Sequence, residues 1–267
     1  MAQPTKRSKT WLYAALFIFI LLEAAAATMG RKYYMTRVKS ITLEETAYLY
    51  ITPEDNAESV LSKLKEAIAP QSADGFMLLA EHNRFDSRRR SGKFAIKDGD
   101  TMKDIYYRIV SNTQTPVKLT IPSTRSIPQA VGIICRQLML DSAELSRYTG
   151  SATYYNRIGY TTETLPSLFI PETYEVYWDI KPEELMIRLS KERRKFWNDE
   201  RKAKAEAIGL TFEEVATLAS IVDEETNDNS EMPIVAGLYI NRLKRGMPLQ
   251  ADPTVKYALG DPTRKRI

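Results

Sequence analysis

The residues TFEEVATLASIVDEET, at positions 211–226, decide the fold of the second half of this chain. Thr211 and Glu214 have the Ser/Thr-x-x-Glu spacing of a capping box, so the sequence predicts that a helix begins here. Apolar residues then recur over three turns and form a broad stripe on one face of this helix. The stripe consists of Phe212, Val215, Ala216, Leu218, Ala219, Ile221 and Val222. Three consecutive acids, at positions 223–225, end the helix.

The three acids lie on different sides of the predicted helix. At about 100° per residue, Glu224 points away from the apolar stripe, whereas Glu225 lies on one flank and Asp223 slightly farther round on the other. A carboxylate on the flank of a buried face is expected to be partly desolvated, and a desolvated carboxylic acid keeps a proton that it can donate near neutral pH. Glu225 is therefore a candidate general acid. The alternative is that the acids mark a solvated helix end, where they would oppose the helix dipole.

The residues that follow add polar groups to this candidate site. A second helix is predicted to end at Gly246, and the run MPLQADPTVKYALGD at 247–261 is predicted to be non-helical. Two polar residues of this run stand among apolar neighbours, as sugar-binding groups do in a cleft. We expect the two helices and this run to bring four residues together: Glu225, Asn241, Gln250 and Asp252.

Composition excludes several other kinds of chemistry. The chain has 267 residues, and 38 Lys and Arg against 34 Asp and Glu give a net charge of +4. This excess is too small to predict nucleic-acid binding. A single cysteine, Cys135, and a single histidine, His82, exclude an intrachain disulfide and a Cys/His metal cluster. The sequence also has no glycine-rich phosphate loop, so we expect no metal and no cofactor.

The amino-terminal residues are organised like a membrane anchor. Three basic residues at positions 6–9 precede a run from Trp11 to Met29 whose only charge is Glu23. At about 1.5 Å per residue, this run comes close to spanning a bilayer core of about 30 Å. We expect an uncleaved anchor with residues 1–10 in the cytoplasm and the rest of the chain outside. A cleaved signal peptide is the competing interpretation, because small residues at 24–27 would suit a signal peptidase.

The rest of the chain is predicted to form an α+β protein with two folded parts. After a linker at 30–41, residues 42–112 show a strand–helix–helix–strand order and then a helix through Val110. The stretch GDTMKDIYYRI at 99–109 is similar to part of a LysM sugar-binding repeat. Residues 113–267 are predicted to be mostly helical, with a few strands. The longer helices of this part are expected at 126–140 and, as one charged helix, at 181–207.

Two separated motifs resemble one known family. LASIVDEET at 218–226 and VAGLYINRLKRGMPLQADPTVKYALG at 235–260 resemble the signature of the endolytic murein transglycosylases, the YceG-like family, which reads ASIVEKET followed by VFINRL, GM, LQ and DPTV. FIPETY at 169–174 is similar to the family's Trp-Phe-x-Pro-Asp/Glu-Thr-Tyr element. Asp223 stands where the family has glutamate.

The resemblance implies a function for the site. It implies that Glu225 is the catalytic acid and that Asn241, Gln250, Asp252, Glu172 and Tyr174 help to bind peptidoglycan glycan strands. The expected reaction is a lytic transglycosylation, which needs one carboxylate because the substrate's own C6 hydroxyl is the nucleophile. The expected partners are the glycan strands, the lipid bilayer and wall-synthesis enzymes, and termination of nascent strands is an expected role.

Alternatives follow from the same resemblance. Family members continue through a Tyr-Asn-Thr-Tyr element and a Gly-Leu-Pro-Pro-Gly segment, so the resemblance implies that the catalytic domain of this chain is incomplete at its carboxyl end. A non-catalytic, membrane-anchored murein-binding or scaffold protein is therefore the main alternative function. The label aminodeoxychorismate lyase has also been used in this family, but that chemistry needs pyridoxal phosphate, and the sequence has no phosphate-binding loop for it.

Overall fold

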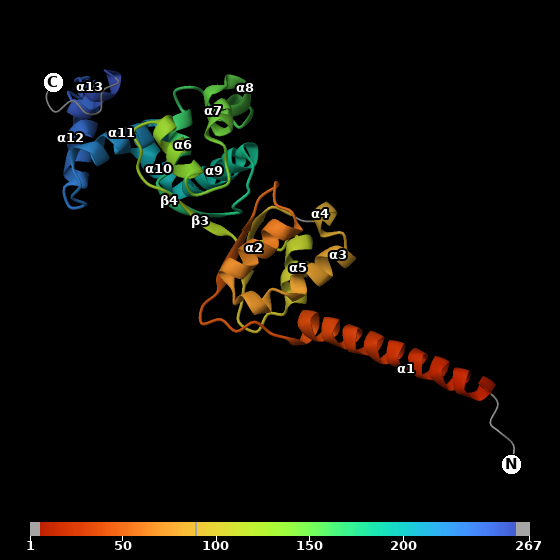
Figure 1. The fold of residues 1–267 in the computed structure, drawn as a ribbon. Coiled ribbons are helices and arrows are strands. Elements are labelled where there is room, and N and C mark those ends of the chain that lie inside the picture. Colours follow the sequence, from red (N-terminus) through yellow and green to blue (C-terminus); the bar gives the residue numbers. More distant parts are fainter. Residues whose placement is uncertain (1–5, 89, 260–267) are drawn as a thin grey trace, which may run out of the picture. The chain divides into compact units, whose positions relative to one another are not determined.

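The computed structural model describes residues 6–88 and 90–259 (Figure 1). Half of the predicted cytoplasmic segment 1–10 and the last eight residues of the predicted domain 113–267 lie outside the described residues. The chain forms two compact units. Unit 1 contains the described residues up to Val117 together with the short segment Tyr177–Asp179, and unit 2 contains Lys118–Val176 and the described residues from Ile180 onward.

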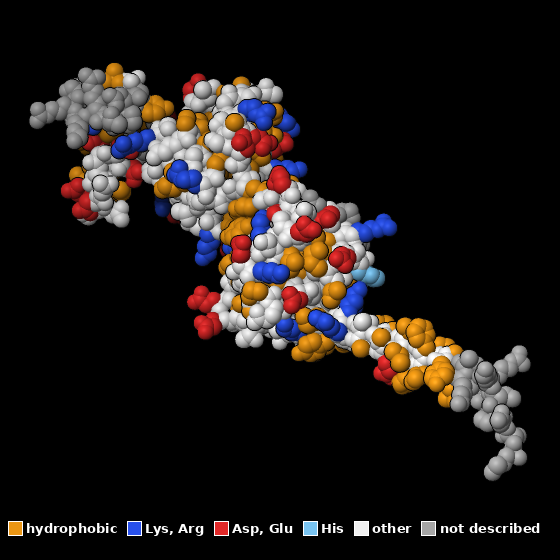
Figure 2. Space-filling model, viewed as in Figure 1, with side chains coloured by type: hydrophobic (Ala, Val, Ile, Leu, Met, Phe, Trp, Pro, Cys, Tyr) orange, Lys and Arg blue, Asp and Glu red, His pale blue; other side chains and the backbone are white. Residues whose placement is uncertain are grey.

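The chain begins with one long apolar helix. Helix α1 spans Lys6–Tyr33 and continues into a π-helical turn at Tyr34–Val38. Residues 11–38 include a window with a mean hydropathy of 2.1 and no buried residues. Figure 2 shows hydrophobic side chains gathered around this helix. Its length and composition are sufficient to cross a membrane, and a signal sequence at this position would have the same properties.

Unit 1 contains a small sheet covered by helices. Strand β1 (Ala47–Ile51) pairs antiparallel with β2 (Gly92–Ile96), with Leu49 opposite Phe94. The helices between and after the strands are α2 (Ala57–Ala67), α3 (Gly75–His82), α4 (Phe85–Arg88) and α5 (Met102–Val110). The predicted strand–helix–helix–strand order is present, with α4 as an additional turn of helix before β2. Four fully buried aromatic side chains contribute to its core: Phe76, Phe85, Phe94 and Tyr106.

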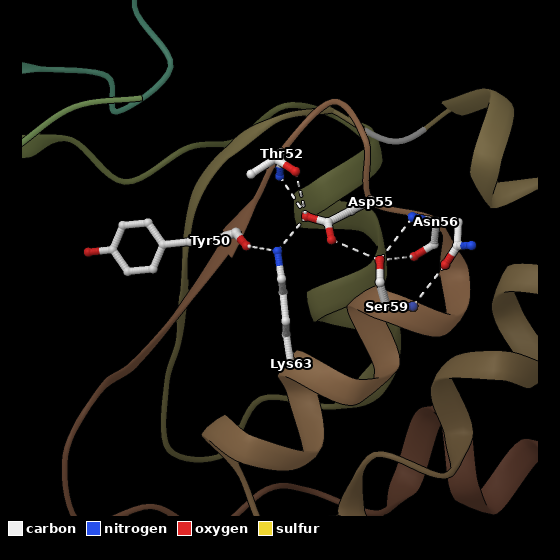
Figure 3. Close-up of polar contacts among 6 residues, drawn as sticks. All are labelled: Tyr50, Thr52, Asp55, Asn56, Ser59 and Lys63. Carbon is white, nitrogen blue, oxygen red and sulfur yellow. Dashed lines mark hydrogen bonds and ion pairs between the residues drawn. The ribbon is translucent and has the colours of Figure 1, made fainter. Parts of the chain in front are cut away.

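A buried carboxylate fixes the connection between β1 and α2 (Figure 3). Asp55 accepts hydrogen bonds from the backbone N–H of Thr52 (2.7 Å), the hydroxyl of Ser59 (2.8 Å) and the ammonium of Lys63 (2.5 Å). Lys63 also donates to the backbone carbonyl of Tyr50 (3.1 Å). Burial alone would raise the pKa of Asp55, but these hydrogen bonds outweigh it and lower the pKa to about 2.

Unit 1 is completed by residues from much later in the chain. In the segment Tyr177–Asp179, the Trp178 ring lies edge-on to Tyr50, with ring centroids 5.0 Å apart. The carboxylate of Asp179 accepts hydrogen bonds from the hydroxyl of Ser91 (2.7 Å) and the side-chain amide of Gln114 (3.0 Å). The predicted division at residue 112 puts this segment with the second part of the chain, whereas the structure packs it onto the first.

Unit 2 is mostly helical. Its two-stranded sheet pairs β3 (Val117–Ile121) with β4 (Glu172–Val176). The helices before β4 are α6 (Ile127–Cys135), α7 (Ser142–Gly150), α8 (Ala152–Arg157) and the 3₁₀ turn Leu165–Leu168. The helices after β4 are α9 (Pro182–Phe196), α10 (Asp199–Ala207), α11 (Phe212–Glu225), α12 (Met232–Lys244) and α13 (Asp252–Ala258).

Three helix predictions for unit 2 are wrong in their extent. The single helix expected at 181–207 is broken between α9 and α10, because Asn198 accepts a hydrogen bond from the Arg201 N–H and caps a new helix. Helix α6 ends at Cys135 instead of residue 140. Just after this end, the Gln137 side-chain amide accepts a hydrogen bond from the Thr120 N–H and donates one to the Thr120 carbonyl. The run expected to be non-helical contains α13, whose proline lies in the first turn, where no N–H is needed.

Candidate active site around Glu225

Helix α11 begins as the sequence predicts and ends on the candidate acid. The capping box is present, with the Thr211 hydroxyl and the Glu214 carboxylate each accepting a hydrogen bond from the other's backbone N–H. The buried part of the apolar stripe contacts residues from α12 and from the segment before α13. This core consists of Leu218, Ile221, Val222, Tyr239 and Ala251. Glu225 is the last residue of α11.

Glu225 is held by a tyrosine from α12. The Tyr239 hydroxyl donates a hydrogen bond to Oε1 of Glu225 at 2.8 Å, and Tyr239 is only 5% exposed. Burial, followed by the hydrogen bond and the charge of Glu225, raises the pKa of Tyr239 to about 12. The charge of Arg242 lowers this pKa and the charge of Asp252 raises it, both by less than the first three causes. Tyr239 is therefore a protonated hydrogen-bond donor at any physiological pH.

The expectation that Glu225 is partly desolvated is wrong for the described part of the chain. The residue is exposed. Glu225 is the last residue of α11, so its carboxylate lies beyond the buried part of the apolar stripe. It contacts the buried Tyr239 but is itself exposed to solvent.

The other two acids bind a loop that lies far away in the sequence. Asp223 accepts a hydrogen bond from the Ser123 hydroxyl at 2.6 Å, and Glu224 accepts one from Nε of Arg125 at 2.8 Å. The three consecutive carboxylates thus have three different partners. Glu224 was predicted to point away from the apolar stripe; it is exposed and forms an ion pair with Arg125.

An arginine of α12 holds the segment that contains Gln250. Nη1 of Arg242 donates to the carbonyl of Leu249 at 2.5 Å and lies 3.2 Å from Oε1 of Gln250. Gln250 has a φ of +53°, a left-handed conformation that is uncommon outside glycine. This turn directs the chain into α13, which begins with Asp252.

The remaining predicted residues are not gathered around Glu225 in the same way. Asn241 is exposed and follows Tyr239 by two positions on α12, so its side chain points about 200° away from that of Tyr239. Tyr174 is buried in β4, and its hydroxyl donates to the carbonyl of Ile170 at 2.7 Å. Glu172 is exposed and accepts a hydrogen bond from the N–H of Thr173. Substrate roles for these three residues stay predictions.

The sequence alone did not point to three residues of this region: Tyr239, Arg242 and Arg125. A signal for Tyr239 existed, because a tyrosine inside an apolar helical face needs a partner for its hydroxyl, and Glu225 was the nearest candidate carboxylate. Arg125 had no such signal, since about a hundred residues separate it from its partner. Among residues 6–88 and 90–259, no group of three His, Cys, Asp or Glu side chains could hold a metal ion.

The fold and the site define an α+β protein with an amino-terminal apolar helix and a tyrosine-bound carboxylate at a helix end. Such a carboxylate can transfer a proton to or from a bound substrate. The chain belongs to the YceG-like family, whose sequence profile matches residues 49–267.

Known relatives match different lengths of this chain. The endolytic murein transglycosylase of Bacillus subtilis is 41% identical over 51 residues, which are 19% of this chain and 14% of that protein. The endolytic murein transglycosylase of Streptococcus pneumoniae serotype 2 is 23% identical over an alignment of 278 positions that covers 92% of this chain. This chain spans about half (49%) of the length of that pneumococcal relative.

A solved structure has the same fold. The crystal structure of a putative yceG-like protein from Listeria monocytogenes superposes with a TM-score of 0.54 at 20% sequence identity, over 84% of this chain and 79% of that one. The predicted α+β fold is confirmed by this likeness and by the strands and helices described above.

Proposed function

We propose that this protein is a lytic transglycosylase that cuts within peptidoglycan glycan strands, between N-acetylmuramic acid and N-acetylglucosamine. The observation that carries the proposal is the hydrogen bond from Tyr239 to Glu225, which orients the carboxylate that the sequence resemblance implies to be the acid. Further support comes from the relatives, which are named endolytic murein transglycosylases.

Glu225 acts first as an acid and then as a base. Protonated Glu225 donates its proton to the glycosidic oxygen as the bond from that oxygen to C1 of the muramyl residue breaks. The C6 hydroxyl of the same residue then forms a bond to C1 and gives its proton to the Glu225 carboxylate. The products are a free sugar hydroxyl and a 1,6-anhydro-muramyl end, and no water is consumed. Because the nucleophile is part of the substrate, the second step has the effective-molarity advantage of an intramolecular reaction.

The hydrogen bond from Tyr239 gives the two carboxylate oxygens of Glu225 different roles. It donates to Oε1, so Oε2 is the oxygen that faces the substrate and carries the transferable proton. A buried donor of this kind fixes the rotamer of an exposed side chain, which otherwise would sample several orientations. A glycan strand lying over Glu225 would exclude water and strengthen its hydrogen bonds.

The amino-terminal half of the chain would hold the catalytic part at the membrane and close to its substrate. We propose that α1 remains attached as an anchor, with residues 1–10 in the cytoplasm and the two units on the outer side of the membrane. In this arrangement the LysM-like part at 42–112 holds the glycan strand while unit 2 cuts it. Wall-synthesis enzymes would then be neighbours in the same membrane, and cleavage close to them would end the growth of nascent strands.

The test is the comparison of Glu225→Gln with Glu224→Gln in the purified full-length protein. General acid–base catalysis contributes roughly 10²–10⁴-fold, so Glu225→Gln should lower the formation of 1,6-anhydro-muramyl ends by that factor. Glu224→Gln should retain most of the activity, because Glu224 bonds to Arg125 and not to Tyr239. Mass spectrometry of the released glycans measures both. Equal activity of the two variants would refute the assignment of the acid.

The same experiment tests the alternative function. A wild-type protein that pellets with insoluble murein but produces no anhydro ends would be a non-catalytic murein-binding protein.

A further inference from the structure

The loop between β3 and α6 brings a cation to the catalytic end of α11. Ser123 and Arg125 of this loop bond to Asp223 and Glu224, two contacts that join residues about a hundred positions apart. The loop itself is braced, since the N–H of Arg125 donates to Oε1 of Gln129 at 3.0 Å. Arg125 is therefore held against Glu224, the residue that precedes Glu225, within the same unit.

Arg125 uses only part of its hydrogen-bonding capacity on Glu224. A guanidinium group has five N–H donors, and within the described residues Nε is the nitrogen of Arg125 that has a hydrogen bond. The side chain is 57% exposed, against 32% for its partner Glu224. The two terminal nitrogens thus present donors to solvent in the planar arrangement that matches a carboxylate.

The negative charges at this end of α11 would oppose the binding of an anionic substrate unless a cation lies nearby. Three consecutive carboxylates at positions 223–225 repel any substrate that is itself anionic. The ion pair with Arg125 offsets the charge of Glu224, and the remaining N–H groups of the guanidinium can bind an anion at this end of α11. Because the site stays net negative, a glycan that carries a carboxylate needs direct contact with the Arg125 guanidinium to bind here, whereas a neutral glycan does not.

We propose that Arg125 forms an anion subsite beside Glu225 and binds a carboxylate on the lactyl substituent of the muramyl residue. The carboxylate is either that of the lactyl group itself or one of the peptide attached to it. This inference rests on the proposed function, because it names the part of the same substrate that is recognised. Arg125 is a binding residue in this proposal, and Glu225 alone handles the proton.

The experiment measures binding without cleavage, in the Glu225→Gln background of the full-length protein. The probes are three preparations of soluble glycan strands: strands with peptides, peptide-free strands with lactyl carboxylates, and strands whose carboxylates have been converted to amides. Arg125→Gln should weaken binding of at least one carboxylate-bearing preparation by roughly 10- to 100-fold, as expected for the loss of a charge-assisted hydrogen bond. It should leave binding of the amidated strands unchanged. The preparation that responds identifies which carboxylate is bound.

Glu224→Gln is the matched control, since it breaks the same ion pair but keeps the guanidinium. It should retain or tighten the binding of carboxylate-bearing strands. Equal weakening by Arg125→Gln and Glu224→Gln would overturn the proposal, because Arg125 would then only brace α11. Equal weakening on amidated strands would also overturn it. Neither result depends on whether Glu225 catalyses cleavage, which the product analysis of the Glu225 variants decides separately.

Discussion

Replacing Asp55 by asparagine should destabilise unit 1 by an amount that its pKa defines. The carboxylate is 8% exposed, and its pKa falls from 3.8 to about 2 on folding. Each pH unit between these values corresponds to about 1.36 kcal/mol, so the ionised form contributes about 2 kcal/mol to the free energy of unfolding. Asp55→Asn removes this contribution at pH 7. It also leaves the ammonium of Lys63 facing an amide in place of a carboxylate.

The sign of the pH dependence follows from the lowered pKa. Stability from Asp55 is fully present above about pH 4, where the unfolded chain is also ionised, and it is lost as the pH falls toward 2. The difference in stability between the wild type and Asp55→Asn should therefore shrink over this range and nearly vanish at its lower end.

Hydrogen exchange followed by mass spectrometry can measure this locally. Peptides that cover β1 and α2 should exchange roughly 30-fold faster in Asp55→Asn than in the wild type at pH 7, because about 2 kcal/mol corresponds to that factor in the opening equilibrium. Comparison at each pH removes the intrinsic pH dependence of exchange. Glu45→Gln is the control, since it neutralises an exposed carboxylate just before β1. Equal exchange of Asp55→Asn and Glu45→Gln at pH 7, or a difference undiminished near pH 2, would refute this account of the Asp55 network.

Tyr239→Phe should keep the fold and lower the formation of anhydro ends by roughly 10- to 100-fold, because it removes one hydrogen bond to the Glu225 carboxylate; unchanged kinetics would show that the bond does not position Glu225. Residues 11–29 should remain attached in protein extracted from membranes, and amino-terminal sequencing that begins at residue 28 or 29 would instead identify a cleaved signal peptide. Deletion of 42–112 should reduce pelleting with insoluble murein, whereas unchanged pelleting would assign this part a purely structural role.

Local signals in the sequence predicted local structure well. The capping box of Thr211 and Glu214 placed the start of α11, and Gly246 placed the end of α12 to within two residues. The break in the helix expected at 181–207 was missed because charged residues with high helix propensity lie on both sides of Asn198, and its capping role depends on the backbone turning there.

Contacts between distant residues were beyond the reach of the sequence. Periodicity placed Glu225 on the flank of the stripe, but only the packing of α12 shows that Tyr239 reaches it while Asn241 points elsewhere. The partners of Asp223 and Glu224 come from a loop about a hundred residues earlier, and no spacing rule connects positions that far apart. The exposure of Glu225 likewise depends on which other segments pack over the end of α11, and the pattern of apolar residues within α11 does not predict this.

The return of residues 177–179 to unit 1 has a consequence for the order in which the protein is made. The ribosome synthesises Gln114 before Asp179, which lies 65 positions later, so the nascent first unit lacks the Asp179 carboxylate until β3, β4 and the segment between them have been made. Until then Ser91 and Gln114 lack the Asp179 acceptor, and the Tyr50 ring lacks its Trp178 neighbour. A chain interrupted between Gln114 and Tyr177 would lack these contacts of the first unit.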